Sequence, residues 1–436
     1  MPERRPGLPT LDVRSLPGPE TIQRRVLPNG LTILARENFS SPSVVLSGSL
    51  TVGALDESLE HGGLADLTAS GLMRGTASRS FAKIYESIES LGASLAFGAG
   101  THSTSFRGKS LAEDLPVVLA LAGDCLRSPE FPKAQMTRLR AEKLTALSIR
   151  DQDTGSIAQL AFDELLYGSH PYSLPSDGCR ETVASLTHET VRAFRRRTYG
   201  PRGMLLAVVG AVRAEEALDA VQAVFGDWQN PRQPVQAAIP PVTGLTGIVR
   251  RDRALPGKSQ SDVVIGGVGP SRYDPDYLAA ALGNSILGRF GLMGRLGDVV
   301  RASAGLAYSV ASSVAGGHGP GPWQVMAGVA PANVERAIDL IRQEIRRFVR
   351  DGVSPQELRD NQANFIGRLP IQMESNEGVA ASLVNMERFG LGLDYYQRYP
   401  GLVASVTRDQ ILATARRFLE PDLMAIAVAG PAVAER

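Results

Sequence analysis

A chain of 436 residues exceeds what one hydrophobic core usually organises, so two domains of about 200 residues each are the first expectation. The 46 basic and 45 acidic residues nearly cancel, which excludes an overall field that would attract nucleic acid or an anionic membrane. Only two cysteines occur, which excludes a disulfide framework.

Residues 1–24 form a charged, proline-rich extension that lacks the apolar segment of a secretory signal. The longest apolar runs are far shorter than the ~20 residues that span a bilayer. We therefore expect a cytoplasmic protein, or a periplasmic one if a signal peptide has been removed, with neither nucleic acid nor a membrane as partner.

Residues 62–76, with the sequence GGLADLTASGLMRGT, are expected to form a helix. Leu64, Leu67 and Leu72 are spaced so that they can face a core, and Gly75 followed by Thr76 ends the helix. The remaining inward positions carry no side chain that would bind a metal or transfer a proton.

Two later stretches of the chain recur in its second half. The segment that starts at Gly92 and the one that starts at Gly305 both predict two strands, a long helix, a short loop and another helix. The segment from Val183 aligns without a gap with the one from Val403, 220 residues later. Such self-similarity indicates an internal duplication.

Each copy of the Val183 repeat predicts the same local structure. A threonine N-cap (Thr187, Thr407) begins an amphipathic helix, and a proline turn (Pro201, Pro421) leads into a buried apolar strand. The order of elements recurs with the sequence, so the two halves should share one fold.

We therefore predict an α+β protein of two similar domains, residues 25–229 and 245–436, joined by a proline-rich linker over 230–244. Each domain should have a mainly antiparallel sheet with helices packed on one face. The domains should form a clamp, and function should lie in the cleft between them.

Four stretches carry a resemblance to a known family. They begin at Val26 (VLPNGLTILARE), Gly63 (GLADLTASGLMRGT), Gly168 (GSHPYSLPSDG) and Asn284 (NSILGRFGLMGRLGDVVRASAGLAYSV). Together they resemble the pitrilysin/insulinase family of inverted zinc peptidases, which includes the mitochondrial processing peptidase. The resemblance covers residues 25 to 430 and implies the two-domain clamp.

The family's metal site is degenerate in this chain. The resemblance places Asp66, Ala69 and Ser70 where the family has His-x-x-Glu-His, the two zinc ligands and the general base. The family's third ligand, a glutamate, should fall near residues 146–148, which read Ala-Leu-Ser. We therefore expect no metal in this chain.

Other potential metal ligands lie near these positions. The acids nearest the third position are Glu142 and Asp151, and His61 precedes Asp66 by five residues. A makeshift His61/Asp66 site competes with the simpler interpretation of a surface histidine and a first-turn aspartate that the helix dipole favours.

The second half keeps another element of the family's site. Arg301 and Tyr308 have the family's spacing, with Gly305 at the turn between them. A guanidinium and a phenol both donate hydrogen bonds to a peptide carbonyl, and these bonds strengthen as the oxygen becomes an oxyanion. The alternative is that Arg301 complements a helix C-terminus while Tyr308 is a half-buried strand aromatic.

The glycine-rich run GRFGLMGRLG from Gly288 does not fit a phosphate-binding loop, because no strand-GxGxxG-helix pattern occurs. The resemblance implies that it handles the substrate chain, with Gly288, Arg289, Gly291 and Gly294 as substrate-binding candidates. Arg295 could also touch substrate, with a solvated side chain as the alternative.

The resemblance implies a metal-free subunit of a heteromeric zinc peptidase, inactive alone. Its partner would be a homologous catalytic subunit with His-x-x-Glu-His and zinc, and its substrates would be peptides or unfolded segments. Two alternatives remain, namely a non-catalytic structural or assembly subunit and a stand-alone peptide-binding protein.

Overall fold

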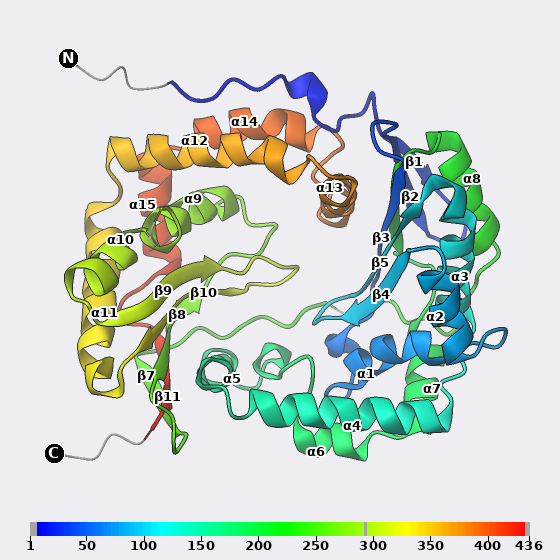
Figure 1. The fold of residues 1–436 in the computed structure, drawn as a ribbon. Helices are drawn as coiled ribbons and strands as arrows, with labels where there is room; N and C mark the ends of the chain where they lie inside the picture. Colours follow the sequence, from blue (N-terminus) through cyan, green and yellow to red (C-terminus); the bar gives the residue numbers. More distant parts are fainter. Residues whose placement is uncertain (1–6, 237, 292–293, 432–436) are drawn as a thin grey trace.

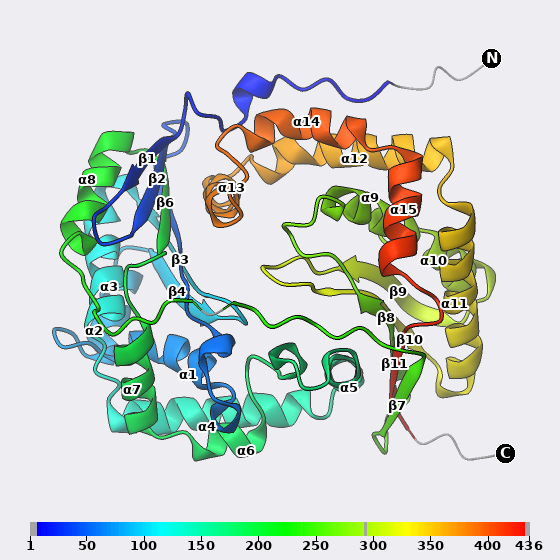
Figure 2. The same cartoon turned by 180° about the vertical axis from the view of Figure 1, so that it is seen from behind.

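The computed structural model describes residues 7–236, 238–291 and 294–431. Figures 1 and 2 show it from opposite sides. Within these residues the strands form two mixed sheets, sheet 1 with six strands from the first half and sheet 2 with five strands from the second half. The predicted two-domain α+β architecture is confirmed.

Sheet 1 has the strand order β1-β2-β6-β3-β5-β4. Its strands and the helices of the same half are β1 (Gln23–Val26), β2 (Thr32–Glu37), β3 (Ser43–Leu50), β4 (Ser94–Ala99), β5 (Thr104–Leu111), β6 (Leu205–Gly210), α1 (Leu64–Gly71), α2 (Phe81–Glu89), α3 (Leu115–Arg127), α4 (Lys133–Arg150), α5 (Thr154–Tyr167), α6 (Arg180–Ser185), α7 (His188–Thr198) and α8 (Ala214–Phe225). Short 3-10 turns lie at Val13–Ser15, Ala54–Asp56, Leu59–His61, Leu72–Arg74, Ala112–Asp114 and Pro171–Ser173.

Sheet 2 has the order β7-β11-β8-β10-β9. Its half contains β7 (Val249–Ala254), β8 (Ser261–Val268), β9 (Ala307–Val314), β10 (Pro322–Val329), β11 (Ala425–Gly430), α9 (Tyr277–Gly288), α10 (Gly294–Leu296), the π-helix η7 (Gly297–Ser303), a 3-10 turn (Pro331–Asn333), α11 (Val334–Asp351), α12 (Pro355–Gln372), α13 (Asn376–Arg388), α14 (Tyr395–Ser405) and α15 (Arg408–Phe418).

The two sheets have the same topology apart from the extra strand β1. Strand β2 pairs with β6 in parallel, as β7 pairs with β11, and the other pairings are antiparallel. The prediction of mainly antiparallel sheets from a duplicated sequence is confirmed. Thr187 and Thr407 cap α7 and α15, since each hydroxyl accepts a hydrogen bond from a first-turn N–H (3.1 and 3.2 Å).

The helices of each half cover one face of their own sheet. In sheet 1 the apolar side chains of this face form one core with α3 and α8, and in sheet 2 they form another with α9, α11 and α15. Helices on one face were predicted for each domain. The opposite face of each sheet is also apolar, and a helix of the other half covers it (Figure 1).

This cross-covering is reciprocal. Helix α13 of the second half packs Val379 and Leu383 against Val45 and Val209 of sheet 1. Helix α5 of the first half packs against the β8 and β11 face of sheet 2 in the same way. Both helices follow a long helix (α4, α12) at equivalent places in the repeat, so equivalent elements are exchanged between the halves.

The first residue of each exchanged helix is a buried polar anchor. Thr154 Oγ1 of α5 donates to Asp262 Oδ2 on β8 at 2.5 Å, and both residues are 8% exposed. Asn376 of α13 donates to the Ser43 carbonyl (3.1 Å) and accepts from Asn38 Nδ2 (2.7 Å). Buried polar groups that lose a partner are costly, so these bonds hold each helix to the opposite sheet.

Between α8 and β7 the described residues contain no helix or strand, and the predicted linker lies in this stretch. No helix in the described part of the chain is long and apolar enough to cross a membrane.

We expect Thr154→Val to lower the free energy of unfolding by about 1–3 kcal/mol, because the buried Asp262 carboxylate loses its hydroxyl donor. Urea denaturation followed by circular dichroism measures the change. The matched control is Thr145→Val on the exposed face of α4, which should change stability by less than about 0.5 kcal/mol. Equal effects of the two substitutions would contradict the anchoring role.

Candidate functional site

Helix α1, which carries the degenerate metal positions, begins at a close backbone contact. Gly63 has φ 87°, and a Cβ on it would lie 2.6 Å from the Asp177 carbonyl oxygen. Gly178 (φ 76°) approaches the backbone of Gly62 in the same way. The glycine pair at the start of the predicted helix is therefore required by packing against the 177–178 loop.

Glu57 caps the N-terminus of α1, a role that the sequence did not reveal. Its carboxylate accepts hydrogen bonds from the backbone N–H groups of Gly63 (2.9 Å) and Ala65 (2.5 Å). Burial raises the pKa of Glu57 to about 7, against the opposing effect of these hydrogen bonds.

The three degenerate positions lie on α1 as predicted, but one of them has a partner of opposite charge. Asp66 Oδ2 forms an ion pair with Lys143 Nζ of α4 at 2.5 Å, and the Asp66 side chain is only 16% exposed. Ala69 is buried and Ser70 is half-buried. An ammonium group thus contacts the position that the family resemblance assigns to the first histidine.

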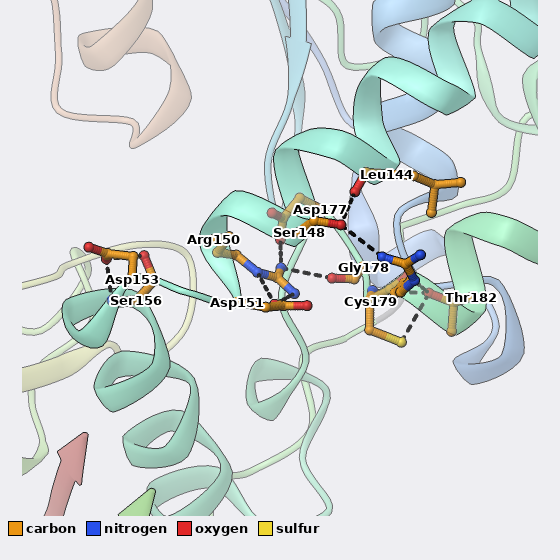
Figure 3. A network of polar contacts seen from close by, with 11 residues as sticks. Leu144, Ser148, Arg150, Asp151, Asp153, Ser156, Asp177, Gly178, Cys179 and Thr182 are labelled. Atoms are coloured by element: carbon orange, nitrogen blue, oxygen red, sulfur yellow. Dashed lines mark hydrogen bonds and ion pairs between the residues drawn. The ribbon is translucent and has the colours of Figure 1, made fainter. Parts of the chain in front are cut away.

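The stretch predicted for the third ligand, residues 146–148, is occupied by structural contacts. Leu147 is buried in the core. Ser148 Oγ donates to the Leu144 carbonyl (2.9 Å; Figure 3). It also accepts from Arg180 Nη1 (2.8 Å).

The C-terminal end of α4 continues this polar network (Figure 3). Arg150 Nη1 donates to Asp177 Oδ1 (2.8 Å) and to the Gly178 carbonyl (2.9 Å), and its Nε lies 3.3 Å from Asp151 Oδ1. Glu142, the other nearby acid, pairs with Arg74 (2.6 Å). Both acids therefore have cationic partners.

The residues at this site do not fit zinc. Zinc needs three or four neutral imidazole, thiolate or carboxylate ligands, whereas the Asp66 carboxylate faces an ammonium and its neighbours are alanine and serine. His61 Nδ1 is hydrogen-bonded to Ser58 Oγ (2.8 Å). Within residues 7–236, 238–291 and 294–431 no three His, Cys, Asp or Glu side chains form a potential metal site.

Arg301 lies on the π-helix η7 and is exposed. Its guanidinium has no hydrogen bond or ion pair with any described residue. The helix ends at Ser303, and Gly305 (φ 64°), two residues later, donates its N–H to the Arg301 carbonyl (3.1 Å). π-helical turns are rare in proteins, and those that occur are often found at functional sites. The irregular backbone therefore favours a role for Arg301 beyond helix termination.

Tyr308 lies on β9, an edge strand of sheet 2, at a β-bulge. Gly328 of β10 pairs with Ser309 and Val329 pairs with Ala307, so Tyr308 is the extra residue of the bulge. Its side chain is 70% exposed, and its hydroxyl has no partner among the described residues. A bulge changes the direction of a side chain and is common beside active sites.

The degenerate metal site and the Arg301/Tyr308 element do not meet within one chain. Helix α1 lies beside sheet 1, whereas α10 and the π-helix that follows it lie on the far side of sheet 2 (Figures 1 and 2).

The glycine-rich segment borders a cavity of about 540 Å³. Arg289 and Gly291 line it, together with Tyr277 and Asn284. The Arg289 guanidinium has no hydrogen bond or ion pair among the described residues, and Gly291 has open space where a Cβ would be. Two of the four substrate-binding candidates thus face a cavity large enough for a ligand.

The other two glycines make close packing contacts, and Gly294 also lines a neighbouring cavity of about 380 Å³. A Cβ on Gly288 would touch Ser312 of β9, and Gly294 (φ 62°) approaches the Ile286 carbonyl. Arg295 forms a bidentate ion pair with Glu357 (2.6 and 2.7 Å), which joins α10 to α12. Arg295 also lines the same neighbouring cavity, so its contact with substrate stays a prediction.

The two-domain α+β fold, with one mixed sheet in each half, is that of a peptidase-like protein. The family description "Insulinase (Peptidase family M16)" matches residues 32–165, and "Peptidase M16 inactive domain" matches residues 185–365. The chain belongs to the M16, or insulinase/pitrilysin, peptidase family, as the four stretches of sequence predicted.

The relatives of this chain include proteins of different kinds. An uncharacterized zinc protease of Streptomyces coelicolor is 26% identical over 402 residues, which cover 92% of this chain and 87% of the relative. Cytochrome b-c1 complex subunit 1 of Rattus norvegicus mitochondria is 28% identical over 279 residues, covering 62% and 56%. A crystal structure of a peptidase M16 inactive domain from Pseudomonas fluorescens superposes with a TM-score of 0.87 at 26% identity, covering 95% and 99%.

Lys143 is the site residue that sequence reasoning missed. It follows Met136 and Leu139 and precedes Leu147 at helical spacing on α4, so it takes a core-facing place in an otherwise apolar stripe. A lysine in such a stripe signals a buried or half-buried acid opposite, which here is Asp66.

Restoring the family motif with Asp66→His, Ala69→Glu and Ser70→His should not restore zinc binding, because the Lys143 ammonium and the missing third ligand remain. Adding Lys143→Glu places a carboxylate on the residue that contacts position 66, and we expect close to equimolar zinc after dialysis, measured by plasma mass spectrometry. Lys143→Gln combined with the same three substitutions is the control, because it removes the ammonium without adding a carboxylate ligand. Equimolar zinc in the triple variant would contradict this account.

The Glu57 carboxyl should make stability depend on pH. The folded state holds its proton up to about pH 7, whereas the unfolded chain releases it near pH 4.5, so this group stabilises the fold fully below pH 4.5 and the effect is lost as pH rises to 7. We expect the free energy of unfolding of the wild type to fall relative to Glu57→Gln between pH 4.5 and 7. A constant difference in urea denaturation across this range would refute the assignment.

Proposed function

We propose that this chain is a metal-free subunit of a heteromeric zinc peptidase. It would contribute substrate binding and oxyanion stabilisation to a homologous partner that carries His-x-x-Glu-His and the zinc. The substrates would be peptides or unfolded protein segments.

The proposal rests on the exposure of Arg301 and Tyr308 and on their lack of polar partners among the described residues. Both are exposed, neither side chain has a polar partner among the described residues, and both sit on irregular backbone, a π-helix and a bulge. A residue with only a structural role would be expected to pack or pair. Free donors at an edge strand are instead positioned to meet a group from outside the chain.

The chemistry of the pair suits a peptide carbonyl. The guanidinium offers up to five N–H donors and the phenol offers one O–H, so both can donate to a single carbonyl oxygen. As that oxygen gains negative charge, the donors stabilise it more strongly than they stabilise the ground state. The metal-activated water would be supplied by the partner.

The loss of the metal site in this chain fits the same division of labour. Asp66 is neutralised by Lys143, and Ala69 supplies no base, so hydrolysis on α1 has no nucleophile. The chain alone should therefore be inactive. Activity requires a second chain whose zinc site faces Arg301 and Tyr308.

A structural or assembly subunit is the second candidate. It is favoured by the 28% identity to cytochrome b-c1 complex subunit 1 of rat mitochondria. The two candidates differ in what Arg301 and Tyr308 do, because assembly alone does not need free oxyanion donors.

We expect Arg301→Ala and Tyr308→Phe each to lower kcat about 100- to 1,000-fold in the complex with its catalytic partner, the usual effect of removing one oxyanion donor. Peptide cleavage by the reconstituted complex is the measurement. Arg336→Ala on the outer helix α11, an exposed arginine without a side-chain partner among the described residues, is the matched control.

Light scattering should show that all three variants assemble normally. Full cleavage by both site variants, with assembly intact, would leave the assembly role as the better explanation. Stoichiometric zinc with cleavage by the isolated chain would overturn the proposal entirely.

A further inference from the structure

A second cavity, of about 530 Å³, lies where α13 crosses sheet 1. One wall is β3, β4, β5 and the β4–β5 turn, and the other is α13. We call it the crossing pocket; its described lining is Ser47, Gly48, Gly98, Ala99, Gly100, Ser103, Ser105, Arg107, Ala381, Val384, Asn385 and Arg388. Its size is within the range of ligand-binding pockets.

The walls of the crossing pocket are made of small residues. Nothing lies within 4 Å of the place a Cβ on Gly98 would take, and at Gly100 only the Ser103 carbonyl does, at 3.9 Å. The hydroxyls of Ser47 and Ser103 have no hydrogen bond with any described residue. The pocket therefore remains open beside a sheet face that α13 otherwise covers with apolar contacts.

Two guanidinium groups line this space from opposite walls. Arg107 is exposed on β5, where its cross-strand neighbours are the small residues Ser47 and Ala96. Arg388 is the last residue of α13 and is half-buried. In the part of the chain that the structure describes, neither guanidinium has a hydrogen bond or an ion pair, and the lining includes no acid.

Lys109, a cation close to the pocket, differs from the two arginines because it has an acidic partner on α13. Lys109, two residues along β5, forms an ion pair with Glu377 in the first turn of α13 at 2.6 Å. An acid thus meets the lysine at one end of the crossing, whereas the two arginines line the pocket at the other end without an acid in its lining.

Two histidines among the described residues near Arg388 add no charge to the pocket. Burial, followed by the charges of His318 and Arg388, lowers the pKa of His102 to about 4, and burial and then Arg388 lower that of His318. Both imidazoles are therefore neutral near pH 7. The pocket carries the net charge of its two guanidiniums, and partial desolvation makes an unpaired charge costly.

We propose that the crossing pocket binds the carboxylate of an acidic peptide. Two guanidiniums can hold one carboxylate through charge-assisted hydrogen bonds, and the Ser47 and Ser103 hydroxyls add neutral donors. The volume leaves room for peptide backbone beside the carboxylate. The proposal deepens the proposed function, because it gives the substrates of the clamp an acidic residue or a free C-terminus.

Binding to the chain without its partner tests the proposal. Three fluorescein-labelled peptides of one sequence are compared by anisotropy: one with a central glutamate and an amidated C-terminus, one with glutamine instead, and the glutamine peptide with a free C-terminus. We expect at least one carboxylate peptide to bind about tenfold more tightly than the neutral one. The peptide that does so identifies the source of the carboxylate.

Arg107→Met and Arg388→Met should each remove most of this preference, whereas Arg336→Met on α11 should keep it. Arg107 is exposed, so Arg107→Met should fold. If Arg388→Met lowers the melting temperature, Arg388→Lys is used in its place, because lysine keeps the positive charge. Equal affinity for all three peptides, or an unchanged preference in folded Arg107→Met, would overturn the proposal. Because no partner is present, failure of the reconstituted peptidase would not affect this result.

Discussion

The reciprocal exchange of α5 and α13 is the constraint on which the rest of this structure depends. Both sheets are apolar on both faces, and the helices of each half can cover only one face. Either half by itself would leave a sheet exposed to water. The two halves therefore form one folding unit, and their relative placement is determined by packing and by the buried anchors Thr154 and Asn376.

The exchange also determines where ligands can reach the protein. Since helices cover the centre of each sheet, open positions remain at sheet edges and at the ends of the crossing helices. Tyr308 lies on the edge strand β9, and the crossing pocket lies at the end of α13. The bulge at Tyr308 and the π-helix that carries Arg301 are irregular elements at such places.

Features that depend on local sequence patterns could be predicted from the sequence. The repeat predicted two equivalent sheets, Thr187 and Thr407 predicted helix starts, and the motif spacing predicted that α1 would carry Asp66, Ala69 and Ser70. It could not find the exchange of helices, because an apolar strand such as β6 shows that both faces are buried without showing which helix covers each face. Arg107 and Arg388 are separated by most of the chain, so only the fold brings them to one pocket.

The Asp66–Lys143 pair joins α1 and α4 without a metal ion. A family zinc site of this kind would join two ligands on α1 to a third on α4, and so would fasten these helices together. Here a carboxylate on α1 and an ammonium on α4 make the same link at 2.5 Å, with a cation from the chain itself. Because the pair is only partly exposed, breaking it would leave a poorly solvated charge, so the link persists without metal.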